Sequence, residues 1–391
     1  MAYFNLEETK RRVEKVKGIL REKNLDCAII YYDELNVADG WYLTGWCPQF
    51  EKEAVMVFAN EADPILLGGP ESAPFAKYAS AITENYCFKP FMVPEEEYPN
   101  ATIIGFDDLN KILQDKGIHI KRIGIVGSFY FPHSIYVLLQ EGFKGAEFVD
   151  ITDEYDYLRY FKSPWEVQNI RTAFGMTYEA LKAMEAKVKP GATEIEVAAA
   201  GEYACRSRNA NNFAFQTMVG SGIMSNAVAP VASNTPMKAG DMVMVGIAPR
   251  YNGYAGVMGD TLPVSGEYTQ EQKDCINVIR EVFRKTRDAL KPGETGKTLD
   301  PIGAKIYEKH DWTKYIVCPF VHGLGLMEAE RPFFGPNGTD VLQPGSIVSI
   351  DISIFGHPKH HGVRVETGYL ITETGYEPLS PEMDARLEKE V

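Results

Sequence analysis

The sequence predicts an α/β protein of the α+β kind, with two domains and an internal duplication in the second. A chain of 391 residues is long enough for two domains that each bury a sizeable core. Short apolar strands alternate with helical patterns up to the acidic, aromatic stretch from Asp150 to Tyr157, and longer helical patterns follow it. We therefore expect a mixed α/β domain over residues 1–157 and a second domain over residues 158–391.

The elements of the first domain are predicted from apolar periodicity. Residues 8–23 carry a helical stripe of apolar side chains. Residues 27–32 and 123–126 are short apolar runs of the length typical of buried strands. Residues 53–59 and 64–67 are predicted to form a hairpin, because a polar turn separates two apolar runs.

The second domain is predicted to begin with a helix at Pro164. Proline suits the first turn of a helix, because its missing N–H would have no partner there. Further along, two kinds of segment recur in the same order and at about the same separation. A Lys-Pro-Gly-x-Thr segment at residues 189–193 returns at residues 291–295, and a glycine turn with an apolar strand at 240–246 returns at 345–351. Such self-similarity indicates a duplicated structural unit.

Composition and charge exclude several classes of protein. The formal charge of −14 argues against a nucleic-acid surface, which requires clustered Lys and Arg. No apolar run approaches the length of a membrane span, and the N-terminal residues form a charged helix without a signal-peptide core. The six cysteines lie far apart without a Cys-x-x-Cys pair. We therefore expect a cytoplasmic protein with reduced thiols that binds neither nucleic acid nor membrane.

Three segments of the second domain could carry chemistry: residues 321–326 (VHGLGL), 349–351 (SID) and 362–366 (GVRVE). In order and spacing they resemble the C-terminal half of the creatinase/aminopeptidase P family of Xaa-Pro peptidases. That resemblance implies a creatinase-like domain over residues 1–157 and a pita-bread domain, with its pseudo-twofold duplication, over residues 158–391.

The resemblance also implies an incomplete metal site. Metallopeptidases of the family hold two metal ions with two Asp, one His and two Glu. Carried over residue by residue, His322, Asp351 and Glu366 fall on the last three positions, with Asp351 replacing the usual Glu. The two Asp positions fall on Gly246 and Val257, whose side chains cannot bind a metal. We therefore expect no bound metal and no cofactor.

This conclusion does not depend on the choice of register. A Gly-Asp turn and a Gly-Tyr pair anchor the two positions eleven residues apart. If Asp260 is taken as the second ligand, Pro249 becomes the first, and if Asp241 is taken as the first, Asn252 becomes the second. No frame supplies both carboxylates.

The main functional hypothesis is a metal-independent hydrolase or lyase that cleaves a C–N bond in a small cationic or zwitterionic substrate, such as a guanidino, amidine or N-substituted amino acid. Creatinase and ectoine hydrolases resemble this chain and suggest that the fold can do this without metal. The main catalytic histidine of creatinase falls on Ala229, however, so its own machinery is not expected here. Two alternatives remain: an Xaa-Pro dipeptidase or aminopeptidase with a degenerate metal site, and a non-catalytic pita-bread binding protein.

His322 and Glu366 are the predicted acid/base pair. Glu366 would bind a cationic nitrogen or deprotonate a water, and His322 would pass a proton to the leaving nitrogen. Asp351 is expected to face Glu366, so that one of the two carboxyls holds a proton. An ion pair of these carboxylates with Arg364 or Lys359 is the alternative interpretation.

Substrate-binding candidates lie near these groups or on an aromatic loop of the first domain: Asp260, His360, His361, Arg364, Phe50 and Lys52. The loop from Trp46 to Lys52 resembles a segment that reaches the partner's active site in creatinase dimers. Aromatic residues gather on the same segment. We therefore expect a homodimer in which this loop closes the partner's cleft.

Overall fold

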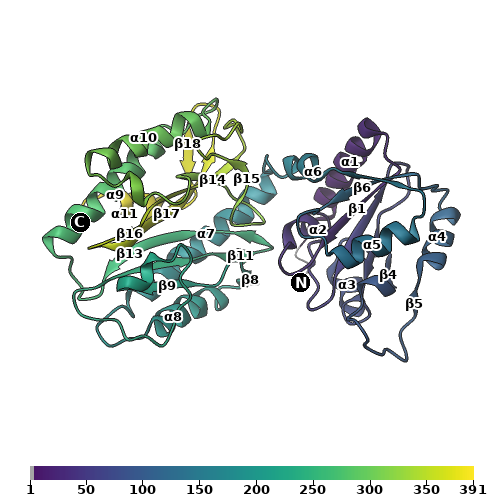
Figure 1. Ribbon diagram of the computed structural model, residues 1–391, viewed down its shortest axis with the longest axis horizontal. Coiled ribbons are helices and arrows are strands. Elements are labelled where there is room, and N and C mark those ends of the chain that lie inside the picture. Colours follow the sequence, from purple (N-terminus) through teal and green to yellow (C-terminus); the bar gives the residue numbers. More distant parts are fainter. Residues whose placement is uncertain (1–3) are drawn as a thin grey trace. The chain divides into compact units, whose positions relative to one another are not determined.

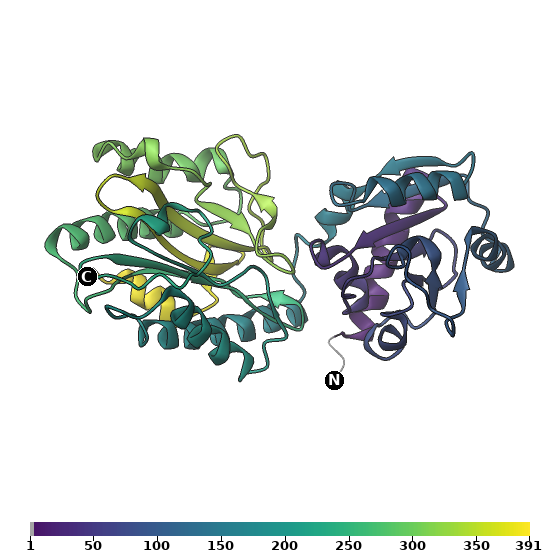
Figure 2. The same ribbon diagram turned by 60° about the horizontal axis from the view of Figure 1, so that its bottom comes forward.

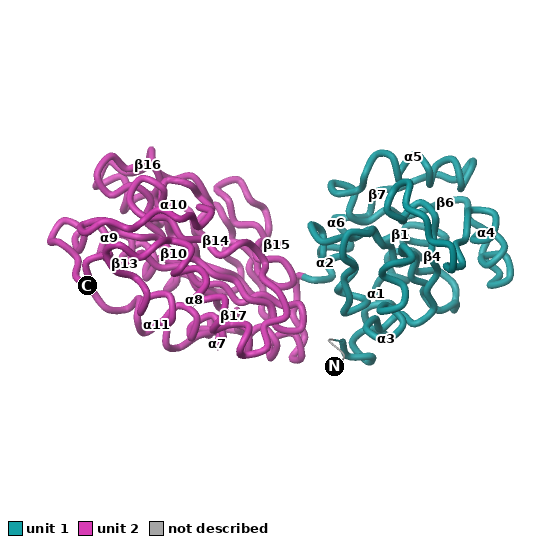
Figure 3. The backbone as a smooth tube through the Cα atoms, turned by 90° about the horizontal axis from the view of Figure 1, so that it is seen from below, with its two compact units in different colours: residues 1–159 teal, residues 160–391 magenta. Residues whose placement is uncertain are grey.

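The computed structural model describes residues 4–391. The chain divides into two compact units, residues 1–159 and 160–391, which Figure 3 shows in teal and magenta. Each unit combines helices with its own β-sheet, which confirms the predicted fold class. Within residues 4–391, no helix combines the length and the apolar character needed to cross a bilayer.

Unit 1 is built on one seven-stranded sheet with the strand order β5-β4-β3-β2-β1-β6-β7. Strands β1, β2 and β3 pair antiparallel, whereas the other neighbours pair parallel. Figure 2 shows helix α1, in purple, lying along the strands of this sheet. The elements of unit 1 are α1 Leu6–Lys23, β1 Cys27–Tyr32, α2 Val37–Thr44, β2 Glu53–Phe58, β3 Ile65–Gly68, α3 Ala73–Ala79, β4 Asn85–Phe88, η1 Lys89–Phe91, β5 Ile103–Ile104, α4 Phe106–Asp115, β6 Arg122–Val126, α5 His133–Gly142, β7 Glu147–Asp150 and α6 Thr152–Leu158.

The elements predicted for the first domain are present within one or two residues of their expected bounds. Strand β1 matches its prediction, and every one of its residues is buried, as expected for the centre of a sheet covered on both faces. The hairpin of β2 and β3 is also confirmed. The aromatic stretch before Trp46 forms helix α2, which packs on β1 and β2.

Unit 2 is built on an eight-stranded sheet. Seven of its strands follow the order β15-β14-β16-β17-β13-β10-β9, and the eighth, β18, pairs with β17. Figure 1 shows β16, β17 and β13 running through the middle of the unit. The elements of unit 2 are α7 Pro164–Glu185, α8 Glu194–Arg206, β8 Asn212–Phe213, β9 Met218–Ser221, η2 Gly222–Asn226, β10 Met242–Ile247, β11 Pro249–Tyr251, β12 Tyr254–Ala255, β13 Met258–Pro263, α9 Gln270–Asp288, α10 Gly296–Lys309, η3 Thr313–Tyr315, β14 Val321–Gly323, β15 Glu330–Phe333, β16 Ile347–His357, β17 His361–Ile371, β18 Tyr376–Pro378 and α11 Pro381–Glu388.

Helix α7 begins where the sequence predicts. Pro164 is its first residue, and the hydroxyl of Ser163 accepts a hydrogen bond from the backbone N–H of Glu166 at 3.3 Å. The carboxylate of Glu166 accepts the N–H of Ser163 in return, at 2.8 Å. This reciprocal capping box satisfies two N–H groups that a helix start otherwise leaves unpaired.

The internal repeats occupy equivalent places in the two halves of unit 2. Gly191, before α8, donates its N–H to the carbonyl of Met237, and Gly293, before α10, donates to the carbonyl of Leu342. Both glycines have a left-handed backbone, with φ of 85° and 96°, which glycine adopts without a steric penalty. Helix α7 packs on β10 and β13, as α9 packs on β16 and β17.

The join between the halves determines the place of the site. Strands β13 and β17 pair antiparallel in the middle of the sheet, with Gly259 opposite Glu366. Three strands of the first half lie on one side of this join, and the strands of the second half lie on the other. Polar residues near the join are therefore enclosed by both halves.

Candidate active site

His322, Asp351 and Glu366 come from three neighbouring strands of the second half. His322 on β14 lies opposite Ser349 on β16, and Asp351, two residues further on, lies opposite Glu366 on β17. Side chains two residues apart on a strand, and directly opposite residues on its neighbour, share a face of the sheet. Potential ligand atoms of the three predicted residues accordingly lie within 4.8 Å of one another.

His322 is held between carboxylates. Its Nδ1 lies 3.1 Å from the carbonyl oxygen of Gly323, to which a protonated Nδ1 donates. The opposite nitrogen, Nε2, lies 3.6 Å from Oε1 of Glu366 and 3.4 Å from Oε1 of Glu328. The hydroxyl of Ser349 donates to Oε1 of Glu366 at 2.9 Å. The ring therefore directs Nε2 towards two acidic side chains.

Arg364 forms a buried, two-pronged ion pair with Asp351. Its Nε donates to Oδ1 at 2.8 Å and its Nη2 donates to Oδ2 at 3.0 Å. The remaining nitrogen, Nη1, donates to the carbonyl of Val228 at 2.9 Å. Such paired bonds match the planar guanidinium to a carboxylate and fix both side chains. The alternative predicted from the sequence, an ion pair with Arg364, is thus realised at Asp351.

The charges around His322 shift its pKa and those of its neighbours. Burial alone would lower the pKa of His322, but the surrounding carboxylates raise it to about 10. Burial raises the pKa of Glu328 to about 7, against the opposing charge of His322. Burial would also raise the pKa of Glu366, but contact with His322 and the charge of Arg364 hold it below its ordinary value. Glu328 is therefore a carboxyl that can exchange a proton near neutral pH.

Glu328 was not among the residues predicted from the sequence. It lies between β14 and β15, six residues after His322, in a loop without apolar periodicity. The available signal was the pair of acids in Glu328-Ala329-Glu330, directly after the histidine turn. Neither periodicity nor turn residues distinguish which of two such acids points towards the histidine.

Glu330, the second of these acids, anchors the loop instead. Nζ of Lys162 donates to its Oε1 at 2.8 Å, and the two side chains are only 1% and 4% exposed. Its Oε2 accepts the backbone N–H of Met327 at 3.3 Å. A Cβ at Gly325 would lie 2.1 Å from Oε1 of Glu330, so glycine is required where the loop crosses this ion pair.

The two positions without ligands lie on the first half of the sheet. Gly246 on β10 pairs with Gly259 on β13, and Val257 immediately precedes β13 and is fully buried. A Cβ at Gly246 would lie 2.5 Å from Cε of Met218, so the space beside it is already filled. The first half therefore offers neither a ligand nor an opening at these positions.

The residues present fit one divalent ion and do not fit a pair. A histidine nitrogen and carboxylate oxygens are suitable donors for Zn²⁺ or Mn²⁺, and one imidazole with one or two carboxylates is converged here. Both oxygens of Asp351 accept hydrogen bonds from Arg364. On the first half of the sheet, Gly246 and Val257 have no side-chain atom that can bind a metal. His322 and Glu366 would hold the ion, with Glu328 beside them.

Three predicted substrate-binding residues lie outside this cluster. Asp260 is the residue after Gly259, so the strand pleat turns it to the opposite face, where Nε of Arg386 donates to it at 2.7 Å. His360 and His361 lie at the tip of the β16–β17 hairpin, where the ring of His360 stacks on His357 with centroids 4.7 Å apart. These three residues are not brought together with His322.

Phe50 and Lys52 belong to unit 1. Phe50 is 75% exposed and has a left-handed backbone, with φ of 65°. The other aromatic residues of the segment point inwards: Tyr42 is 1% exposed, and Nε1 of Trp46 donates to Glu53 at 3.1 Å. The exposed apolar surface of this segment is therefore smaller than the sequence predicts.

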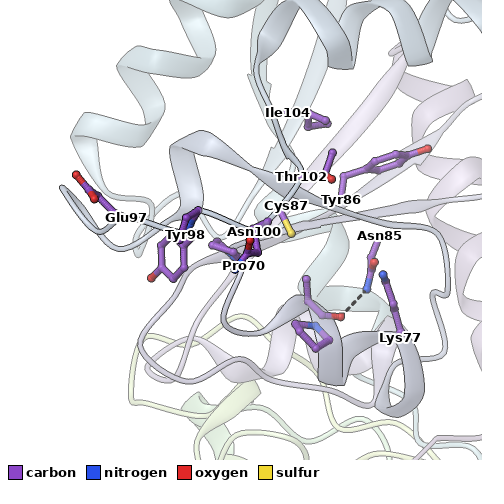
Figure 4. Close-up of a pocket in the computed structure, with 14 residues that line it drawn as sticks. Pro70, Lys77, Asn85, Tyr86, Cys87, Glu97, Tyr98, Asn100, Thr102 and Ile104 are labelled. Carbon is purple, nitrogen blue, oxygen red and sulfur yellow. Dashed lines mark hydrogen bonds between the residues drawn. The ribbon is translucent and has the colours of Figure 1, made fainter.

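Unit 1 also contains an open cavity of about 750 Å³, whose lining includes Lys77, Asn85, Cys87 and Tyr98 (Figure 4). Asn85 uses its side-chain amide to donate to the carbonyl of Ala73 at 3.2 Å, as the dashed line shows. Within residues 4–391, the cluster of potential metal ligands is in unit 2 and includes none of these side chains. The chemistry therefore concentrates at His322.

Comparison with known proteins agrees with this architecture. Residues 168–373 match metallopeptidase family M24, and residues 12–161 match the creatinase/prolidase N-terminal domain. The chain is 28% identical to an Xaa-Pro dipeptidase of Pyrococcus furiosus over 85% of this chain and 97% of that protein. It matches the crystal structure of the prolidase from Pyrococcus horikoshii OT3 with a TM-score of 0.78 and 26% identity, over 94% and 97% of the two chains. An X-Pro aminopeptidase structure from Thermotoga maritima shares the fold, with a TM-score of 0.80 and 22% identity over 94% and 97%.

These similarities overturn the main functional hypothesis from the sequence. A metal-independent enzyme that cleaves C–N bonds in small cationic substrates was expected because two carboxylate positions are empty. The similar proteins are instead Xaa-Pro dipeptidases, within a metallopeptidase family, and they resemble the chain over nearly its whole length. They therefore favour the peptidase alternative and give no support to a metal-free member. The chain belongs to metallopeptidase family M24, with a creatinase/prolidase-type N-terminal domain and a pita-bread domain that contains His322, Asp351 and Glu366.

Proposed function

We propose that this protein hydrolyses the peptide bond of dipeptides of the Xaa-Pro type. The observation that carries the proposal is the cluster of His322 with the buried carboxylates Asp351 and Glu366, three of the five positions at which the family resemblance implies ligands. The similar Xaa-Pro dipeptidase from Pyrococcus furiosus supports the choice of substrate, because the match covers 97% of that protein.

The proposed roles follow from the geometry. His322 and Glu366 would hold a divalent ion, which would supply Lewis-acid polarisation of a carbonyl and a bound water of lowered pKa. Glu366 is kept ionised by its neighbours and would bind the ion through its Oε1, the atom that faces His322 and Ser349. Glu328, whose Oε1 lies 3.4 Å from Nε2 of His322, takes a proton from the attacking water and returns it to the leaving nitrogen.

The substrate class is tested by incubating the purified protein with Mn²⁺, Co²⁺ or Zn²⁺ and a panel of compounds. The panel contains Xaa-Pro dipeptides, dipeptides without proline, Xaa-Pro tripeptides and creatine. We expect free proline from the Xaa-Pro dipeptides and at least about tenfold slower cleavage of the other dipeptides, because a site that has to accommodate the imide nitrogen discriminates in the transition state. Hydrolysis of creatine without any dipeptide cleavage, or no turnover with any metal, would contradict the proposal.

We also infer a homodimer that uses the loop from Trp46 to Lys52. Phe50 supports this inference, because a large apolar side chain that is 75% exposed on a loop is suited to a protein interface. We expect sedimentation at twice the chain mass of 43.7 kDa. Phe50→Ser should weaken self-association by roughly tenfold or more, as loss of an anchor residue does. Phe129→Ser is the control, since Phe129 is 89% exposed but lies outside this loop. A monomeric wild type, or equal effects of both substitutions, would exclude this interface.

A further inference from the structure

We propose that the ion pair of Arg364 and Asp351 takes the place of one of the two divalent ions implied by the family, so that this centre holds a single ion. His322 and Glu366 bind that ion, and Glu328 lies beside it. The inference rests on the proposed function only in treating this cluster as the hydrolytic site. It concerns how the chain itself balances charge there.

Asp351 is already bound by Arg364. Each of its oxygens accepts a guanidinium N–H, at 2.8 and 3.0 Å, and the Asp351 and Arg364 side chains are 8% and 6% exposed. A carboxylate so bonded has one in-plane lone pair of each oxygen directed at the guanidinium, so it cannot chelate an ion from that side. Arg364 cannot lose its proton to make way for a metal. An ion could reach both oxygens only if Arg364 moved to another buried position.

Arg364 also occupies the space in which a second ion would lie. The aliphatic part of Arg364 runs over Gly259, where a Cβ would lie 3.2 Å from its Cδ. Its Nη1 lies 3.5 Å from Sδ of Met218, and Met218 is the residue whose Cε would meet a side chain at Gly246. Arg364 and Met218 therefore fill the volume beside Gly259 and Gly246, the second of which is one of the two positions without a ligand. The aromatic ring of Phe355 lies 5.6 Å from the guanidinium carbon and closes another side.

The charges of the cluster also favour a single ion. The described side chains of the cluster include three carboxylates, on Glu328, Asp351 and Glu366, and one permanent cation on Arg364. A histidine that binds a metal is neutral. With all three carboxyls ionised, one divalent ion therefore brings the sum to zero, whereas two would leave two uncompensated positive charges. Uncompensated buried charge is strongly unfavourable, and here the cation of Arg364 supplies part of the compensation that a second ion would otherwise give.

Calorimetric titration of the metal-stripped protein with Mn²⁺ alone tests this inference. The wild type should bind one ion per chain. Glu366→Gln should weaken binding by at least about tenfold, because even supporting groups of metal sites contribute that much. Asp351→Asn, a matched replacement of a buried carboxylate in the same cluster, removes one negative charge but no atom that binds the ion, so its loss of affinity should be clearly smaller than that of Glu366→Gln.

Arg364→Met supplies a second readout. Removal of the guanidinium leaves Asp351 without its partner, so the variant should bind Mn²⁺ at least about tenfold more tightly than the wild type. Its thermal stabilisation by Mn²⁺ should increase accordingly. If Arg364→Met does not fold, the comparison of Asp351→Asn with Glu366→Gln decides alone.

Three results would overturn the inference: two ions per wild-type chain, equal losses of affinity in Asp351→Asn and Glu366→Gln, or no Mn²⁺ binding at all. Failure of the proposed function is distinguishable from these. In that case one ion binds as described, but Xaa-Pro dipeptides are not hydrolysed.

Discussion

Glu366→Gln should lower the turnover number for an Xaa-Pro dipeptide by about 10² to 10⁴-fold, the range typical of a group acting directly at the reacting centre. Glu366 is 1% exposed, faces Nε2 of His322 at 3.6 Å and accepts a hydrogen bond from Ser349. The amide is nearly the same size, but it lacks the negative charge and presents a donor on one side. His322→Ala should have an effect of the same order, because it removes the imidazole to which Glu366 and Glu328 are directed.

Asp260→Asn is the matched control for this prediction. Asp260 is fully buried and follows Gly259, the residue paired with Glu366, but its carboxylate contacts Arg386 on the other face of the sheet. The turnover number of Asp260→Asn should stay within about threefold of the wild type, although its stability should fall. Equal losses of turnover in Glu366→Gln and Asp260→Asn would show that the charge balance of the sheet, rather than the cluster at His322, determines the rate.

Lys162→Met should lower the free energy of unfolding by about 3–5 kcal/mol, which is the usual cost of removing one partner from a buried ion pair. Lys162 and Glu330 are 1% and 4% exposed and lie 2.8 Å apart, so the substitution leaves a carboxylate in a site with little access to water. Glu330 also holds the backbone of the loop that carries Glu328. Chemical denaturation of the wild type and the variant measures the difference.

Two comparisons identify the cause of that loss. The double substitution Lys162→Met with Glu330→Leu should recover at least about half of the lost stability, because it removes the stranded charge as well. Lys359→Ala removes a lysine whose ion pair with Glu271 is more than half exposed, and it should cost less than about 1 kcal/mol. A double variant less stable than Lys162→Met alone would mean that packing, not burial of charge, is what Lys162 contributes.

The sequence predicted those parts of the fold that depend on local patterns. Strand β1 is an uninterrupted apolar run, and helix α7 begins at a Ser-Pro pair with a Glu three residues after the serine, so both could be placed from their own residues. The duplication was also predicted, because left-handed turns such as those at Gly191 and Gly293 require glycine and therefore leave a mark in the sequence.

The candidate site was predicted only in part, because its remaining members depend on distant contacts. His322, Asp351 and Glu366 follow from the family motif and do converge. The loop that carries Glu328 is positioned by the Lys162–Glu330 pair, whose members lie 168 residues apart in the chain, so no local pattern reveals it. Asp260 was misplaced for a simpler reason: without the register of β13 against β17, the face to which it points was unknown.

The function was mispredicted because the lack of carboxylates at two ligand positions was taken to exclude any bound metal. Gly246 and Val257 do lack ligand atoms, but a cluster with one histidine and several carboxylates is still compatible with one divalent ion. The loss of two ligands therefore argues against a pair of ions and leaves peptide hydrolysis possible. Similarity to Xaa-Pro dipeptidases over most of the chain then favours the peptidase.

The most direct test of this account is the release of free proline from an Xaa-Pro dipeptide by the purified protein, measured by mass spectrometry after the addition of one equivalent of Mn²⁺ per chain. The account predicts steady multiple turnover by the wild type, loss of turnover with a chelator, and a rate at least about 10²-fold lower for Glu366→Gln under the same conditions. No proline release by the wild type, or release at the same rate by Glu366→Gln, would contradict the claim that this cluster is a peptidase centre.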